Sequence, residues 1–305
     1  MTRQLLALWH SLSGVSPATV ILVLLLALCQ LGLQALRLWT ILPRHAALTP
    51  ARTAHAFAMG EWVNIFTPAR AGDALKVVLI HRAAGDCVPL SLPTATGAIV
   101  ADKIVDAGSL VLLCTAAGLA GLSGLTRAGL DLPRAGMVGL VGIAVLLLVG
   151  VAWLRPRTRQ WLTRMRHDLM QGLAALTQPS KLLAALGFSL GAWLSELLAL
   201  RLLCGAIGAA LSPPQLVLAL ALLNLGITVP VSVANLGVYE AALAFGLTRS
   251  GVPLPGAVAI ATLHHAVQLV GTTLAAGGLA LWAAAYRLGS PVRPPSPRSG
   301  EGDRG

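Results

Sequence analysis

Residues 64–76 read Asn-Ile-Phe-Thr-Pro-Ala-Arg-Ala-Gly-Asp-Ala-Leu-Lys, and apolar segments flank this stretch on both sides. Its charged residues, Arg70, Asp73 and Lys76, are spaced so that a helix would place all of them on one stripe, where they can pair. A charge inside a bilayer is costly unless it is paired or faces water, so charged residues at membrane depth are candidates for function. The alternative is an ordinary cytoplasmic loop between two spans. The rest of the chain has to decide between the two.

The composition is typical of helical membrane proteins. Of the 305 residues, 56% are hydrophobic and only 11% are charged, which is rare among soluble domains. A spanning helix needs about 20 apolar residues. Runs of roughly this length or longer that contain no Asp, Glu, Lys or Arg occur at 18–36, 107–126, 135–154, 202–239 and 250–286. We therefore expect an all-α polytopic membrane protein.

The net charge of +11 does not indicate a nucleic-acid partner. The basic residues gather between the apolar segments and at the C-terminus, as the positive-inside rule describes, and there is no basic–aromatic platform for stacking bases. The four cysteines, Cys29, Cys87, Cys114 and Cys204, lack the spacing of a metal site and are typical of small apolar packing residues. The sequence therefore predicts no metal and no cofactor.

The first half of the chain divides into a span and a broken segment. Residues 17–42 form the first crossing, with Arg37 near its interfacial end. Residues 55–67 are too short to span and end at Pro68, and a second short segment then runs to Arg82. Broken backbone at membrane depth needs a polar cavity, so these two segments predict a re-entrant hairpin.

Three charges lie inside the next helix, residues 90–126. Asp102 and Asp106 share a face at helical spacing, and Lys103 can reach Asp106. Apolar residues precede and follow this group, which indicates charges inside the membrane that face protein. Residues 135–154 then form a further span, and the basic segment 155–181 reads as an amphipathic helix on the cytoplasmic membrane surface.

The second half repeats these features in the same order. A span at 182–207 precedes a segment broken by Pro and Gly, and a last span at 257–287 contains His264 and His265. The corresponding positions, at a nearly constant offset, are Asn64 and Asn224, Pro68 and Pro230, Gly72 and Gly237, Asp73 and Glu240, Arg82 and Arg249, Gly85 and Gly251, and Asp102-Lys103 and His264-His265. The order of these features indicates an internal duplication.

We therefore expect one integral membrane domain, residues 1–288, followed by a disordered tail at 289–305. Repeat one covers about 17–126, a linker span and surface helix cover 135–181, and repeat two covers about 182–287. The basic loops give about five full spans plus two re-entrant hairpins, an inverted pair of repeats, a cytoplasmic C-terminus and an N-terminus outside.

Interrupted segments at corresponding places of two halves indicate a midplane transport site. The predicted structural breaks are Pro68, Gly72, Pro230 and Gly237. The predicted substrate or lipid-binding residues are Arg70, Asp73, Lys76, Asp102, Lys103, Asp106, Asn235, Glu240, His264 and His265. We expect Arg70, Asp73 and Lys76 to face Glu240 across the interface between the repeats.

These motifs resemble the transmembrane, flippase-type region of lysylphosphatidylglycerol synthases and its stand-alone relatives, some of which are associated with hopanoid and glycolipid pathways. Pro68 through Lys76 is similar to the family's P-x-R-x-G-E-x-x-R, and Asp102 through Asp106 to its E-R-x-x-D. Pro230 through Glu240 is similar to P-x-S-x-G-G-x-G-x-x-E. The resemblance covers roughly residues 20–287 and implies a membrane domain that moves lipids.

Several positions depart from the family pattern. Asp73 and Asp102 replace Glu, and Lys76 and Lys103 replace Arg, so charge is kept but reach and bidentate geometry are not. Asn235 stands where the family usually has Gly, and His264-His265 lies in the region of a frequent Arg, which would make that cation depend on pH. We find no soluble aminoacyl-transferase domain in the 305 residues and expect no lysyl transfer.

The leading hypothesis is translocation of an anionic or aminoacylated phospholipid or glycolipid across the bacterial inner membrane, with lipid head groups as partners. A small-solute secondary transporter and a non-catalytic partner of a lipid-modifying enzyme or glycosyltransferase remain alternatives. A remote alternative is an intramembrane serine protease, from Gly121-Leu122-Ser123-Gly124 with His264 or His265 as base. Small-residue helix packing explains that four-residue match better, so we expect no enzyme.

Overall fold

The structure is a computed structural model, and it describes residues 14–43, 48–67, 71–84, 90–120, 159–228 and 232–289. The described parts are helical and contain no strand. The predicted span at 135–154, Ser123 and the tail beyond Gly289 lie outside them. Four long helices form the frame, namely α2 (Pro17–Ile41), α5 (Leu92–Ala120), α9 (Pro179–Ala206) and α12 (Leu254–Gly289).

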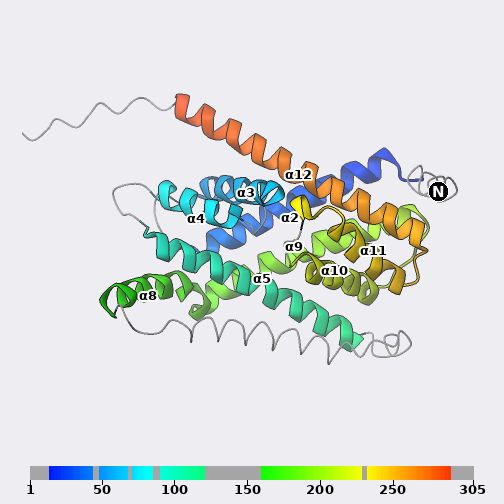
Figure 1. Ribbon diagram of the computed structural model, residues 1–305, viewed down its shortest axis with the longest axis horizontal. Coiled ribbons are helices and arrows are strands. Elements are labelled where there is room, and N and C mark those ends of the chain that lie inside the picture. Colours follow the sequence, from blue (N-terminus) through cyan, green and yellow to red (C-terminus); the bar gives the residue numbers. More distant parts are fainter. Residues whose placement is uncertain are drawn as a thin grey trace, which may run out of the picture.

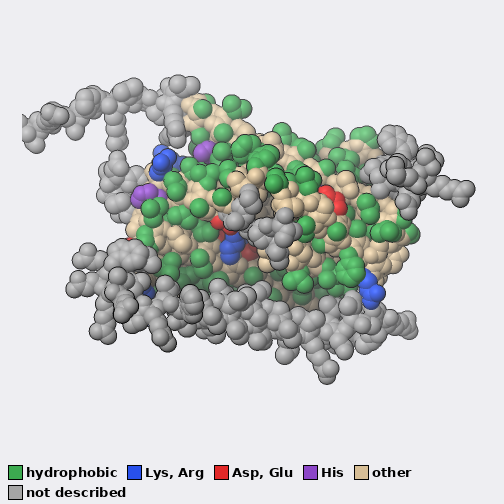
Figure 2. Space-filling model, in the orientation of Figure 1, with side chains coloured by type: hydrophobic (Ala, Val, Ile, Leu, Met, Phe, Trp, Pro, Cys, Tyr) green, Lys and Arg blue, Asp and Glu red, His purple; other side chains and the backbone are tan. Residues whose placement is uncertain are grey.

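Three of the long helices are long and apolar enough to cross a membrane. They are α2, α9 and residues Leu254–Ala285 of α12. Helix α5 has the length as well, but it carries Asp102, Lys103 and Asp106. Large apolar side chains cover the outside of the bundle, as Figure 2 shows for one face. Leu183, Leu194 and Leu281 are among these exposed side chains, and such a surface suits a lipid environment.

Proline and hydroxyl residues set the beginnings of several helices. Ser16 accepts a hydrogen bond from the Thr19 N–H before Pro17, and Thr49 does the same for Arg52 before Pro50. The side chain of Gln215 accepts from the Ser212 N–H at the start of α10 (Pro213–Ile227). A proline in the first turn lacks only an N–H that would have no helical partner, so these starts lie where the sequence favours them.

Two pairs of shorter helices form antiparallel hairpins. The first consists of α3 (Pro50–Phe66) and α4 (Ala71–Ala83), and the second of α10 and α11 (Val238–Arg249). Gly60 and Gly72 bring the first pair together so closely that a Cβ on Gly72 would lie 1.9 Å from the Gly60 carbonyl oxygen. In the second pair, a Cβ on Gly246 would lie 2.7 Å from the Ala219 Cα. Glycine is required at both contacts.

The helices of the two halves run in opposite directions. In Figure 1, α2 runs from the right of the molecule to the left and α5 back to the right, whereas α9 runs to the right and α12 back to the left. The hairpin of α3 and α4 lies in the left half and that of α10 and α11 in the right half.

The neighbours also correspond. Helix α2 packs against its counterpart α9. The first helix of each hairpin packs against the long helix of the other half, α3 against α12 and α10 against α5. The second helix of each hairpin packs against the long helix of its own half, α4 against α5 and α11 against α12. Each half of the molecule has its own apolar core, one around the first hairpin and one around the second.

The tip of the second hairpin has an unusual backbone. The short 3-10 helix η4 (Val233–Asn235) packs against α3, and Ala234 and Asn235 have φ values of 55° and 53°, followed by Gly237 at 82°. Asn tolerates the left-handed region better than most residues, so it can replace the glycine expected at position 235. The breaks at Pro68 and Pro230 lie outside the described residues.

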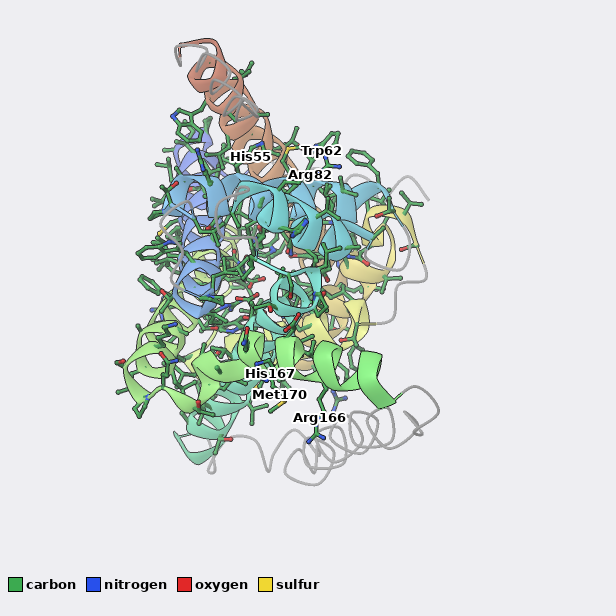
Figure 3. All side chains as sticks on the ribbon, turned by 90° about the vertical axis from the view of Figure 1, so that its left-hand side faces the viewer. His55, Trp62, Arg82, Arg166, His167 and Met170 are labelled. Carbon is green, nitrogen blue, oxygen red and sulfur yellow. The ribbon has the colours of Figure 1, made fainter. Side chains whose placement is uncertain are left out.

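Helix α8 (Arg159–Leu173) follows residues 121–158, which lie outside the described part of the chain. It packs on α5, where a Cβ on Gly172 would lie 2.2 Å from the Thr94 carbonyl oxygen. The side chains of Arg166 and His167 are exposed, as expected for a helix at the surface. Figure 3 views this end of the molecule, where Arg166 and His167 of α8 and His55 and Arg82 of the first hairpin lie.

Candidate functional site

Lys76 is the centre of an ion-pair group inside the first hairpin, which we call the Lys76 group. It is 1% exposed, and its ammonium contacts the carboxylates of Glu61 on α3 and Asp73 on α4, the latter at 2.8 Å. The Phe57 ring lies 4.5 Å from the same ammonium. Asp73 also pairs with Lys103 of α5 at 3.7 Å. The close approach of Gly60 and Gly72 is what lets Lys76 lie between its two acids.

Arg37 is the centre of a second group, the Arg37 group, at the crossing of α2, α5 and α9. Its guanidinium donates to both oxygens of Asp102, at 2.7 and 3.2 Å, and also to Asp106 and to Ser189 of α9 at 2.8 Å. Arg37 and Asp102 are each 1% exposed. A buried bidentate ion pair is stable only when its polar atoms have hydrogen-bond partners. Ser189, which accepts from Arg37, also bonds to Ser109 at 2.6 Å, so Ser109 extends the group.

The second hairpin has a corresponding group around two histidines. His265 Nδ1 lies 2.7 Å from Glu240 Oε1, and the other Glu240 oxygen accepts from the Gly237 N–H at 2.7 Å. The Tyr239 hydroxyl lies 2.7 Å from His264 Nδ1, and the Tyr239 ring stacks on His265 with centroids 4.1 Å apart. His264 Nε2 is buried without a hydrogen-bond partner among the described residues.

A fourth group joins α2, α9 and α12 through two amides and a carboxyl. Gln268 Nε2 donates to Gln30 Oε1 at 3.0 Å, and Gln30 Nε2 donates to Glu196 Oε2 at 2.9 Å. Glu196 is 7% exposed. Its hydrogen-bond partner is therefore an amide and not a cation.

Two polar contacts of the first half have counterparts in the second. Asp73 with Lys103 in the first half has its counterpart in Glu240 with His265 in the second. If α2 is aligned with α9 so that Arg37 matches Glu196, the same alignment matches Gln30 with Ser189. The bond from Arg37 to Ser189 then corresponds to the bond from Gln30 to Glu196.

The structure divides the predicted site residues between these groups. Asp73, Lys76 and Lys103 lie together, Asp102 and Asp106 share Arg37, and Glu240, His264 and His265 lie together at the second hairpin. Asn235 and Gly237 form the hairpin tip, Gly72 lies at the helix contact, and Arg70 lies outside the described residues.

Two expected pairings are not found. Lys76 is turned into its own hairpin, because Glu61 lies within reach on the facing helix, and Glu240 binds His265 instead of facing Lys76. Lys103 pairs with Asp73, because Asp106 on its own helix already binds Arg37. Arg37 itself is buried and not interfacial as expected.

Eight polar residues of these groups are absent from the sites predicted from the sequence, namely Gln30, Arg37, Glu61, Ser109, Ser189, Glu196, Tyr239 and Gln268. Arg37, Glu61 and Glu196 are charged residues inside otherwise apolar helices, which was the signal that could have identified them. Gln30 and Tyr239 carry no such signal, because uncharged polar residues are common in spans.

The Lys76 and Arg37 groups reach the surface of the bundle. The side chains of Glu61, Asp73, Asp106 and Lys103 are 23%, 25%, 27% and 36% exposed. Figure 2 shows acidic and basic side chains at the surface midway along the molecule, with apolar side chains elsewhere on this face. Together the described residues of these groups supply three cations and four carboxylates. Such a site can bind a group that carries both an anion and an amine.

No set of three His, Cys, Asp or Glu among the described residues is arranged to bind a metal ion. Neither a curated protein nor a solved structure matches the chain. A family model, the lysylphosphatidylglycerol synthase TM region, matches residues 2–276. This match covers most of the sequence and all four polar groups. The chain is therefore a membrane protein that belongs to the lysylphosphatidylglycerol synthase TM region family.

Proposed function

We propose that this protein moves a phospholipid or glycolipid head group across the bacterial inner membrane. The observation that carries the proposal is the set of partly exposed charges that opens to the side of the bundle, midway along an apolar face. A water-soluble substrate would need a path along the bundle, whereas a lipid head group enters from the side while its acyl chains stay in the membrane.

The division of charge supports a head group with an anion and an amine. Lys103, the most exposed cation of the two groups, is placed to meet a phosphate, and Asp73 and Asp106 are placed to meet an ammonium group. Lys76 and Arg37 are buried and saturated by carboxylates, so in this proposal they position the acids.

An apolar groove supports a lipid over a small solute. It has a volume of about 510 Å³, lies between α10 and α11, and is lined by Leu222, Leu225, Ala241 and Phe245 among others. Its lining also includes Gly237 at the hairpin tip, so an acyl chain in the groove would lie near the polar Glu240–His265 pair.

The architecture we propose is a pair of inverted repeats with two re-entrant hairpins. The opposite directions of α2 with α5 and of α9 with α12, together with the matched helix contacts, support it. The end that carries α8, Arg82 and Arg166 would face the cytoplasm, because basic residues gather on that side of membrane proteins. The C-terminal end of α12 would then be cytoplasmic and the start of α2 outside.

The experiment is lipid movement in vesicles that contain the purified full chain. Phosphatidylglycerol or lysyl-phosphatidylglycerol with a fluorescent acyl chain is placed in both leaflets, and dithionite, which cannot cross, bleaches the accessible label. We expect the protein to expose the inner-leaflet label, and we expect Lys103→Gln and Asp73→Asn to slow this exposure at least tenfold.

The matched control is Arg201→Gln, because Arg201 is an exposed cation on α9 outside the two groups. It should leave the rate unchanged. Rates that are equal in Lys103→Gln, Asp73→Asn, Glu240→Ala and the unmodified chain would contradict the site, and no movement of any labelled lipid by the unmodified chain would contradict the function.

A further inference from the structure

Glu196 differs from the other acids in the described parts of the transmembrane bundle. Asp102 and Asp106 bind Arg37, Glu61 and Asp73 bind Lys76, and Glu240 binds His265. Glu196 lies in the apolar helix α9, is 7% exposed, and accepts one hydrogen bond from the neutral amide of Gln30. Among the described residues it is the buried acid of the bundle for which no ion pair is found.

The surroundings of Glu196 favour an uncharged carboxyl. A buried carboxylate without a cation is strongly unfavourable, whereas a carboxylic acid is not, and the amide of Gln30 can donate to either form. Asp106 of α5 adds negative charge nearby. Arg37 of α2 donates its hydrogen bonds to Asp102, Asp106 and Ser189, so it does not pair with Glu196.

The other described elements near Glu196 bring amides and aromatic side chains and no further cation. From α12, Gln268 bonds to Gln30, which bonds to Glu196. On α11, the Tyr239 hydroxyl lies 2.7 Å from His264 Nδ1, and His264 Nε2 is buried without a hydrogen-bond partner among the described residues. Helix α10 carries no titratable side chain. Tyr239 stacks on His265, which leads to Glu240, a carboxylate with 21% of its side chain exposed.

We propose that Glu196 is a proton-binding carboxyl of the transport cycle and couples lipid movement to a proton gradient. In this cycle a water-borne proton adds to the Glu196 carboxylate on one side of the membrane. The same proton leaves to water on the other side, with no change in electrons. Protonation removes one negative charge from the core of the bundle and leaves the bond from Gln30 in place. The coupling rests on the proposed lipid movement, but the proton binding does not.

The first measurement therefore needs no transport. Infrared spectra of the purified chain, titrated between about pH 5 and 9, report the carbonyl stretch of protonated carboxylic acids. We expect one such band near neutral pH, and we expect Glu196→Gln to remove it. Glutamine keeps the size of the side chain and the acceptor for Gln30, so this variant should fold, and elution as a single species on gel filtration checks that it does.

The control is Asp168→Asn. Asp168 lies on α8 and accepts a hydrogen bond from Ser91 at 2.9 Å, so it is also an acid with a neutral hydrogen-bond partner, but it is only partly buried. Its removal should leave the band unchanged. A band that survives in Glu196→Gln, or no band in the unmodified chain at any pH in this range, would overturn the proton site.

The second measurement is the vesicle assay with a pH gradient imposed across the membrane. We expect the gradient to change the rate of lipid movement several-fold in the unmodified chain and in Asp168→Asn, but not in Glu196→Gln. A gradient effect that is equal in Glu196→Gln would overturn the coupling. If the unmodified chain moves no lipid at all, the proposed function fails and with it the coupling, while the infrared band still decides whether Glu196 binds a proton.

Discussion

The two hairpins of the molecule lie in similar helix surroundings, but the polar groups near them differ in chemistry. Near the first hairpin the contacts are ion pairs in which Arg37, Lys76 and Lys103 are the cations. Near the second hairpin the contacts join Glu196 to Gln30, Gln30 to Gln268, and Glu240 to His265. The difference teaches that one bundle can hold permanent cations near one hairpin and amides and imidazoles near the other.

The largest expected effect compares Arg37, a buried cation that binds two carboxylates, with Glu196, whose partner is an amide. Arg37→Leu leaves the buried Asp102 and its neighbour Asp106 without a cation, so the free energy of unfolding should fall by about 3–5 kcal/mol. Glu196→Gln at the corresponding position removes no partner of a charge, and it should change that free energy by about 1 kcal/mol or less. Unfolding by denaturant in detergent micelles, followed by circular dichroism, measures both. Equal losses would mean that the two halves do not differ in this way.

A second comparison lies within the first half, between a buried and an exposed lysine on the same acid. Lys76→Met leaves Glu61 and Asp73 without their shared partner and should lower the free energy of unfolding by about 3 kcal/mol. Lys103→Met removes only a pair at 3.7 Å whose lysine is 36% exposed, so its effect should stay below about 1 kcal/mol. The same unfolding measurement applies. A larger effect for Lys103→Met than for Lys76→Met would mean that the exposed pair with Asp73 contributes more to stability than the buried one.

The frame of the fold could be predicted from the sequence because length and hydropathy determine it. The crossings expected at 17–42, 182–207 and 257–287 correspond to α2, α9 and α12 within a few residues. The first broken segment corresponds to α3 and α4, although α3 starts earlier, at Pro50, where Thr49 caps it.

The partners within the site could be predicted only in part. The shared face of Asp102 and Asp106 follows from helical spacing and is confirmed, because both bind Arg37. Arg37 itself, Glu61 and Gln30 meet their partners across helix–helix contacts, and no spacing along the chain encodes which helices touch. The choice of Glu61 by Lys76 depends on the Gly60–Gly72 approach, which the sequence presents only as two glycines among many.

The hairpins allow a third comparison, at the contacts between their helices. Gly72→Ala places a methyl group against the Gly60 backbone carbonyl, which cannot move without its helix, so the free energy of unfolding should fall by about 3 kcal/mol. Gly226→Ala in the second hairpin makes one close contact, 2.6 Å from the Ala242 Cβ, whereas Gly72→Ala makes three, at 1.9, 2.6 and 2.8 Å, so the effect at Gly226 should be smaller, about 1 kcal/mol. The control is Gly108→Ala on α5, where nothing lies within 4 Å, and it should stabilise by about 0.5–1 kcal/mol. Equal losses of unfolding free energy in Gly72→Ala and Gly226→Ala would show that the two helix contacts accommodate an added methyl group equally well.

The smallest expected effect comes from giving the first hairpin the residue type that stands at position 265 near the second. Lys103→His turns the pair with Asp73 into one that is favoured below about pH 6.5, where an ordinary imidazole is charged. The informative quantity is the change in unfolding free energy between about pH 5 and 8, compared with the same change in the unmodified chain.

Because the imidazole is charged only at the acidic end, Lys103→His should add about 1 kcal/mol or less of stability there relative to the basic end. Lys103→Gln is the control, since glutamine has no charge at either end. If Lys103→His and Lys103→Gln depend on pH alike, the charge at position 103 does not stabilise the fold through Asp73, and the pair at 3.7 Å acts on the substrate site alone.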